Sequence, residues 1–131
     1  MIYLDHAATT MVRPETRKAM APYLDEVFGN PSGIHGVSRQ AKNALETARE
    51  RAAELIGAAH PLEIVFTGGG TEADNLAVVG AALAGGRRRA VVTTEVEHEA
   101  VLESVAFLEM LGCRVDRVGV DGEGRLDIAE L

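Results

Sequence analysis

One short glycine-rich run combines the features that a phosphate-binding turn needs. Residues Phe66–Glu72 read Phe-Thr-Gly-Gly-Gly-Thr-Glu and join a short apolar segment to a helical pattern. Consecutive glycines let backbone N–H groups come close to a ligand, and the helix N-terminus that follows them favours an anion. The hydroxyl of Thr71 is a further donor. We therefore expect Gly70 and Thr71 to hold a phosphate group; the alternative is a glycine turn that only begins the helix.

The kind of phosphate ligand stays open on spacing alone. A P-loop ends in Gly-Lys-Ser/Thr, and this run has no lysine, which excludes that class of nucleotide site. Gly68, Gly70 and Ala73 match the dinucleotide fingerprint G-x-G-x-x-G/A, and Glu95 follows near the place of a ribose-binding acid. A dinucleotide is therefore one candidate ligand for this turn.

A histidine follows the next predicted strand and is the second candidate for chemistry. His98 lies in the run Val96–Glu99, and ligands of open α/β sheets bind at the carboxyl ends of strands. His98 is thus expected near the same edge as Gly70 and Thr71, where it could stack on a cofactor ring or transfer protons. The alternative is a residue that only faces solvent. No metal site is expected, because no second histidine is close in sequence.

Three further features carry weaker signals. Leu4–Thr10 is a short strand or extended arm rich in small and hydroxyl residues, and Gly29–His35 is a loop of turn-forming residues with another histidine. Either could line a site from outside the sheet, although turn formation alone would explain both. Cys113 follows a glycine that ends a helix and begins a strand, so we expect it to pack as a small apolar residue.

The elements that position these residues alternate between strand and helix in the second half of the chain. Strand, helix, strand, helix and strand at this spacing predict an α/β fold with a parallel sheet. Residues 1 to about 60 are expected to form a helical arm, and residues 61–131 the start of a βαβ sheet. The predicted helices are Pro14–Val27, Arg39–Ile56, Thr71–Leu83 and His98–Leu111; the predicted strands are Glu63–Phe66, Arg89–Thr93 and Arg114–Val120, followed by a turn at Asp121–Gly124 and a possible helix cap at Asp127.

Composition excludes several classes of function. The 131 residues carry a net charge of −7 and only 4% aromatic residues, which argues against nucleic-acid binding. The one basic cluster, Arg87–Arg89, is expected to be a solvated loop. No apolar run approaches the roughly 20 residues that span a bilayer, and no signal peptide is recognisable. The single cysteine fits a reducing compartment, so we expect a cytoplasmic protein with no membrane contact.

Four segments, in order and in spacing, resemble the cysteine desulfurases of the class V aminotransferase family. The matching runs are Tyr3–Thr10, Gly29–Ser32 with His35, Ile64–Asn75, and Glu97 with His98. The resemblance covers essentially the whole chain. It decides against the dinucleotide, because the glycine spacing arises here inside the desulfurase motif.

The resemblance implies a pyridoxal-phosphate (PLP) enzyme of fold type I that removes sulfur from L-cysteine and leaves L-alanine and an enzyme persulfide. In such enzymes the positions of Gly70 and Thr71 hold the cofactor phosphate, and the position of His98 stacks on the pyridine ring and is proposed to transfer protons. It further implies a homodimer that passes sulfur to an acceptor protein, for iron–sulfur cluster or thio-cofactor assembly. The chain would be part of the large cofactor domain.

The departures from the family pattern concern the residues that complete the reaction. The only lysines are Lys18 and Lys42, both outside the matching motifs, and Cys113 does not match the catalytic cysteine. The Schiff-base lysine, the persulfide cysteine, the rest of the large domain and the small domain are therefore expected beyond Leu131, and the chain alone is expected to be inactive. A selenocysteine lyase, another class V enzyme, or a non-catalytic chain that a partner completes are the remaining alternatives.

Overall fold

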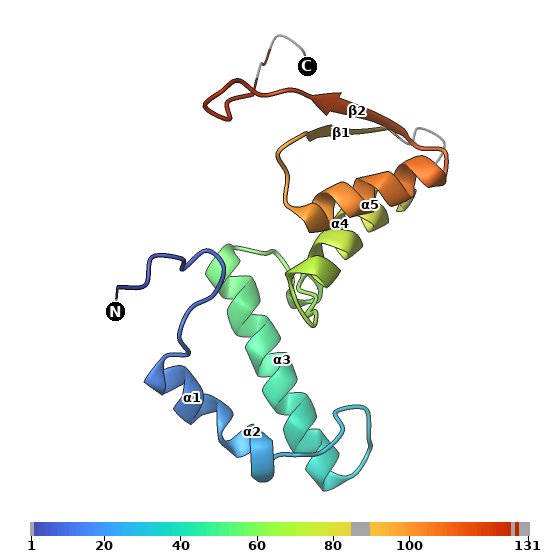
Figure 1. The fold of residues 1–131 in the computed structure, drawn as a ribbon. Helices are drawn as coiled ribbons and strands as arrows, with labels where there is room; N and C mark the ends of the chain where they lie inside the picture. Colours follow the sequence, from blue (N-terminus) through green and yellow to red (C-terminus); the bar gives the residue numbers. More distant parts are fainter. Residues whose placement is uncertain (1, 85–89, 127, 129–131) are drawn as a thin grey trace. The chain divides into compact units, whose positions relative to one another are not determined.

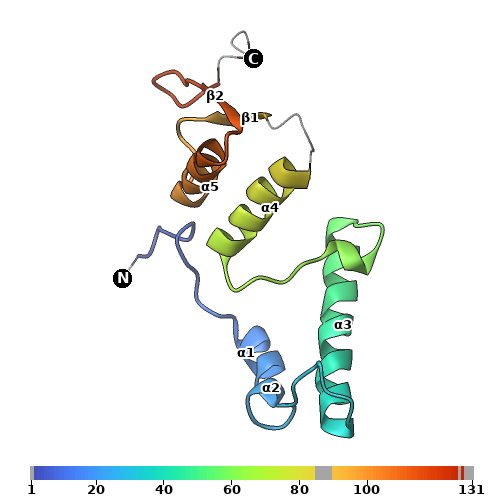
Figure 2. The same cartoon turned by 90° about the vertical axis from the view of Figure 1, so that its right-hand side faces the viewer.

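The computed structural model describes residues 2–84, 90–126 and 128, and the chain divides into two compact units, Met1–Val65 and Phe66–Leu131 (Figures 1 and 2). The predicted loop at Arg87–Arg89 and the predicted cap at Asp127 lie outside the described residues. No helix in the described ranges is long and apolar enough to cross a membrane.

The first unit begins with an extended arm and two short helices. The hydroxyl of Tyr3 donates to the backbone oxygens of Asp5 and Thr9, at 2.7 and 3.1 Å, and so closes the arm into a turn. Helix α1 spans Pro14–Met20 and helix α2 spans Pro22–Asp25. The prediction of one helix over Pro14–Val27 is therefore wrong in its continuity, because Pro22 has no N–H with which to continue the hydrogen-bond ladder of α1.

Helix α3 spans Gly36–Ile56 and ends as predicted. Gly57 adopts a left-handed φ of 72°, and its N–H and that of Ala58 bond back to the last turn. The helix begins three residues before the predicted Arg39, because His35 supplies an N-cap through its side chain. A short 3₁₀ helix, η1, follows at Pro61–Glu63 and contacts α3.

The predicted strand Glu63–Phe66 is not formed. Glu63 ends η1, and residues 64–67 are extended without pairing to any strand in the described part of the chain. A β-strand is defined by its ladder to a neighbour, and here the carbonyl of Ile64 instead accepts a hydrogen bond from the guanidinium of Arg49 on α3. The apolar character of the segment was read correctly, but the partner that would make it a strand is missing from these residues.

The second unit is a helix–strand–helix–strand arrangement. Helix α4 spans Gly70–Ala84, strand β1 Ala90–Thr94, helix α5 Glu99–Met110 and strand β2 Arg114–Val118. The two strands pair in parallel, from Ala90 opposite Arg114 to Thr94 opposite Val118, which confirms the predicted parallel α/β organisation. The sheet has two strands in the described residues, not the predicted three.

A small core holds the second unit together. Leu108 and Val105 of α5 are 0% and 1% exposed, and α5 contacts both α4 and β2. Cys113 is 6% exposed at the start of β2, in agreement with its predicted role as a small apolar residue. Beyond β2, Gly124 at φ 77° closes the turn that was predicted at Asp121–Gly124, and Val120 bridges to Leu126. The core thus fixes α5 against the sheet that precedes and follows it.

Candidate cofactor-phosphate site

The glycine run forms a turn that its own side chains hold. The hydroxyl of Thr67 donates to the carbonyl oxygen of Gly69 at 3.1 Å. The amide of Gly68 donates to the carboxylate of Glu72 at 2.6 Å, so the carboxylate reaches back from the first turn of α4. This pattern is close to a capping box and ties the entry of the helix to its first turn. The turn is therefore ordered without a ligand.

The first turn of α4 presents free donors to solvent. Its first backbone hydrogen bond runs from Ala73 to Gly69, at 3.1 Å, so the amides of Gly70, Thr71 and Glu72 have no acceptor within the helix. A Cβ atom built on Gly69 or Gly70 would meet nothing within 4 Å. An anion can therefore approach the backbone here, where the helix dipole also favours negative charge.

Thr71 adds a hydroxyl at the same place. The residue is exposed, and in the described part of the chain its hydroxyl makes no hydrogen bond. Its carbonyl oxygen accepts from the side-chain amide of Asn75 at 2.8 Å, which braces the first turn. Backbone N–H groups, a hydroxyl and a helix N-terminus together are the donor set that suits a phosphate, so the residues present fit the phosphate of a cofactor.

His98 stands at the corresponding position of the next helix, α5. Its Nδ1 accepts a hydrogen bond from the amide of Ala100 at 3.1 Å, which makes His98 the N-cap. His98 is exposed, whereas Ala100 is 6% exposed. The sequence had placed His98 inside the helix; the structure places it one residue before the helix begins.

A hydrogen-bonded turn leads from β1 to His98. The hydroxyl of Thr94 donates to the carboxylate of Glu97 at 2.8 Å and accepts from the amide of Val96 at 3.4 Å. Sequence reasoning missed this pair, although the spacing Thr-x-x-Glu is a recognisable signal for the start of a helix. The pair restricts the residues that connect the strand end to the histidine.

The structure assembles Gly70, Thr71 and His98 within one compact unit. Helices α4 and α5 pack against each other and run in the same direction, so their N-terminal ends lie at the same end of the unit (Figure 1). That end is also where β1 finishes, as expected for a ligand site of an open α/β sheet. Asn30 and His35 belong to the other unit.

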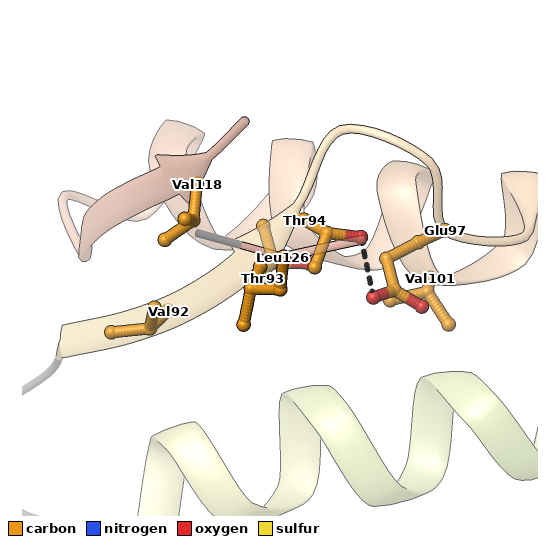
Figure 3. A pocket seen from close by; sticks show the side chains of 7 residues that line it. All are labelled: Val92, Thr93, Thr94, Glu97, Val101, Val118 and Leu126. Carbon is orange, nitrogen blue, oxygen red and sulfur yellow. Dashed lines mark hydrogen bonds between the residues drawn. The ribbon is translucent and has the colours of Figure 1, made fainter. Parts of the chain in front are cut away.

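A pocket of about 450 Å³ lies at the carboxyl end of the two strands (Figure 3). Thr94 and Glu97, which form the turn before His98, contribute to its wall. The remaining lining residues are mostly apolar and come from β1, α5, β2 and the turn after it: Val92, Thr93, Val101, Val118 and Leu126. The pocket therefore joins an apolar surface to the polar turn that precedes His98.

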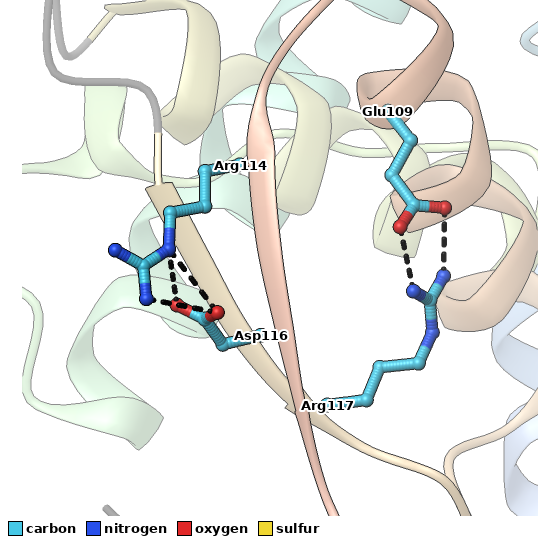
Figure 4. Close-up of polar contacts among 4 residues, drawn as sticks. All are labelled: Glu109, Arg114, Asp116 and Arg117. Carbon is cyan, nitrogen blue, oxygen red and sulfur yellow. Dashed lines mark hydrogen bonds and ion pairs between the residues drawn. The ribbon is translucent and has the colours of Figure 1, made fainter.

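Two ion pairs lie on β2 (Figure 4). Arg117 donates to both carboxylate oxygens of Glu109 near the end of α5, at 2.6 and 2.9 Å, and Arg114 pairs with Asp116 at 2.9 Å. The hydrogen bond from Arg117 lowers the pKa of the Glu109 carboxyl, and the same bond raises the pKa of Arg117. Both groups are solvated, so these pairs are structural links between α5 and β2 of modest strength.

No group of three or more His, Cys, Asp or Glu residues in the described ranges could hold a metal ion.

Comparisons with known proteins agree on one family. The family model described as "Aminotransferase class-V" matches residues 2–131. The chain is 48% identical over 131 residues to the cysteine desulfurase IscS of Dictyoglomus turgidum, covering 99% of this chain and 33% of that protein. The chain thus spans about a third of the length of the curated relatives that it matches.

Solved structures give the same result for the fold. A NifS-like protein superposes with a TM-score of 0.83 at 36% identity, over 94% of this chain and 34% of its own. SspA in complex with cysteine superposes with a TM-score of 0.80 at 38% identity, over 90% of this chain and 34% of its own.

Proposed function

This chain belongs to the class-V aminotransferase family, and on that premise we propose that it is the cofactor-phosphate-binding part of a cysteine desulfurase. The family is pyridoxal-phosphate-dependent. Residues 61–131 would begin the cofactor-binding sheet, and residues 1–60 would form a helical arm beside it. The observation that carries the proposal is the open first turn of α4, with unpaired amides at Gly70 and Thr71 and open space over Gly69 and Gly70.

Gly70 and Thr71 would hold the phosphate of the cofactor. Their amides and the Thr71 hydroxyl are donors, and the N-terminus of a 15-residue helix stabilises the negative charge. The amide of Gly68 is not available, because it already donates to Glu72. The phosphate would thus be bound by α4 itself, and its position would follow the rigid placement of α4 against α5.

His98 would lie against the pyridine ring and take part in proton transfer. The hydrogen-bonded turn of Thr94 and Glu97 and the cap on Ala100 restrict its position. When bound, the cofactor supplies the electron sink that lets bonds at the substrate Cα and beyond be broken. The protein's part at this end is to bind, to orient and to exchange a proton at one imidazole nitrogen.

The substrate would be L-cysteine, and the products L-alanine and an enzyme persulfide passed to an acceptor protein for iron–sulfur cluster or thio-cofactor assembly. SspA, a structural neighbour, is described in complex with cysteine. Lys18 and Lys42 both lie in the first unit, on α1 and α3, and match no motif. The Schiff-base lysine and the persulfide cysteine would therefore come from outside these 131 residues. We place the protein in the cytoplasm as a homodimer, with a selenocysteine lyase as the alternative activity.

The experiment that tests the proposal removes the Thr71 hydroxyl and measures cofactor affinity. Thr71→Val keeps the size and branching of the side chain, and Thr71→Ser restores the hydroxyl. A hydrogen bond to a charged group contributes about 1.5–3 kcal/mol, so Thr71→Val should weaken pyridoxal-phosphate binding about 10- to 100-fold. Thr71→Ser should stay within about threefold of the native affinity, since it keeps that bond.

Two controls separate phosphate binding from general damage. Thr47 is an exposed threonine on α3, and Thr47→Val should leave the affinity unchanged. Pyridoxal, which lacks the phosphate, should bind the native protein and Thr71→Val equally. An unchanged affinity of Thr71→Val for pyridoxal phosphate would contradict the assignment of Thr71, and equal loss for both ligands would show that the phosphate is held elsewhere.

A further inference from the structure

Three of the four histidines occupy the same structural position. His35, His60 and His98 are the N-caps of α3, η1 and α5, and each accepts a backbone amide through Nδ1. The acceptor distances are 3.4, 3.2 and 3.1 Å, from the amides of Ser38, Leu62 and Ala100. Only His98 belongs to the proposed cofactor site.

The direction of the hydrogen bond decides where the proton of His98 lies. A backbone N–H only donates, so Nδ1 must offer a lone pair and cannot carry a hydrogen. In the neutral ring the proton is then on Nε2. We infer that the N-cap of α5 holds His98 in the Nε2–H tautomer, so that the ring presents a hydrogen-bond donor, and no free acceptor, to a bound ligand.

The surroundings of the cap make this arrangement persistent. Ala100 is buried, so its amide has little access to water and would be left without a partner if the ring turned away. The amides of Val101 and Leu102 already bond to the carbonyl oxygen of His98, at 2.8 and 3.2 Å. The amide of Ala100 therefore depends on the imidazole, and losing that bond costs about as much as losing an N-cap.

The tautomer sets what His98 can do at the proposed site. Toward an oxygen or nitrogen atom of a ligand, Nε2 donates a hydrogen bond. The lone pair on Nδ1 is the only place where the neutral ring can accept a proton, and it is engaged by Ala100. Proton uptake by His98 therefore requires the cap to open, which links proton transfer to the first turn of α5. The statement about the ligand rests on the proposed function; the tautomer and the cap do not.

Two amide side chains separate the two nitrogens of the ring. In His98→Asn the amide oxygen takes the place of Nδ1 and keeps the cap, but nothing reaches the place of Nε2. In His98→Gln the amide group reaches the place of Nε2, but the longer side chain no longer caps. His98→Ala removes both groups. Hydrogen exchange of the peptide that covers the first turn of α5, measured by mass spectrometry on the purified protein, reports on the cap.

Exchange in that peptide should be near the native rate in His98→Asn and about five-fold faster in His98→Gln and His98→Ala, since an N-cap contributes about 1 kcal/mol. The visible circular dichroism of bound pyridoxal phosphate should stay closer to native in His98→Gln than in His98→Asn. The control His60→Gln removes the same kind of cap in the other unit, and it should leave both the α5 exchange rate and the cofactor signal unchanged.

The tautomer is also directly observable by long-range ¹H–¹⁵N correlation spectra of ¹⁵N-histidine-labelled protein, with His98→Asn to assign the resonance. A protonated Nδ1 in neutral His98, or equal exchange in His98→Asn and His98→Ala, would overturn the inference. Native-like cofactor spectra in His98→Asn would overturn the donor role at Nε2. If the protein binds no pyridoxal phosphate at all, the proposed function fails, whereas exchange and the tautomer still decide the cap.

Discussion

The loop before α3 offers a prediction in which one substitution changes sign with its background. Gly33 lies beside Ser38, which is 0% exposed and whose hydroxyl lies 3.2 Å from Nε2 of His35. A Cβ atom on Gly33 would sit 2.9 Å from the Cβ of Ser38 and would also overlap its hydroxyl oxygen. Gly33 does not have a positive φ, so alanine can adopt its backbone conformation. The overlap with Ser38 is therefore the main cost of Gly33→Ala.

The magnitude follows from two opposing effects. Forcing an extra methyl group against a buried side chain costs about 1–3 kcal/mol. Replacing glycine by alanine where the backbone permits it stabilises by about 0.4–1 kcal/mol, because the unfolded chain loses freedom. With Ser38 present the overlap dominates, and Gly33→Ala should be destabilising. In a Ser38→Gly background the overlap disappears, and the same substitution should be neutral or stabilising.

Urea denaturation of the four proteins of this cycle measures the coupling, which we expect to be about 2 kcal/mol. Gly29→Ala provides the matched control. Its Cβ would meet the carbonyl oxygen of Val37 at 2.5 Å, and this backbone atom stays in place when Ser38 is changed. Gly29→Ala should thus be equally destabilising in both backgrounds. A coupling below about 0.5 kcal/mol between Gly33 and Ser38 would refute the reasoning.

Two further predictions concern α5. Leu108→Ala should destabilise by about 2–5 kcal/mol, because the side chain is 0% exposed, whereas Met110→Ala, at 84% exposure on the same helix, should change stability by less than about 0.5 kcal/mol; comparable losses in urea denaturation would contradict the core assignment. Since Arg117 lowers the pKa of Glu109, the stabilisation from this pair is present above the ordinary carboxyl pKa and is lost as the pH falls through the lowered pKa. Glu109→Gln should therefore be less stable than the native protein at pH 7 and equally stable at low pH, and a deficit that persists in acid would argue against the pair.

Much of the local structure could be predicted because its causes are local. Gly57 ends α3 in the left-handed conformation that glycine tolerates, and Pro14 begins α1 where its missing N–H is no loss. The run Gly68–Gly70 also acts locally, since it opens the backbone at the start of α4 whatever lies around it. The parallel pairing of β1 and β2 followed from the alternation of strand and helix patterns, for which few connections are possible.

Other features depended on neighbours that are distant in the sequence. Whether the apolar segment at Ile64 becomes a strand depends on a partner strand, and the carbonyl oxygen of Ile64 binds Arg49 instead. The pattern predicted a helix that includes His98, but the ring caps α5 because Ala100 is buried in the core beneath it.

The sequence by itself determined which residues could hold an anion and which family they belong to, because glycine freedom, helix starts and motif order are properties of neighbouring residues. The tertiary structure decided that Gly70, Thr71 and His98 share one end of one unit, and that Nδ1 of His98 is engaged. Packing of α4 on α5 and burial of Ala100 join parts of the chain that no local pattern connects.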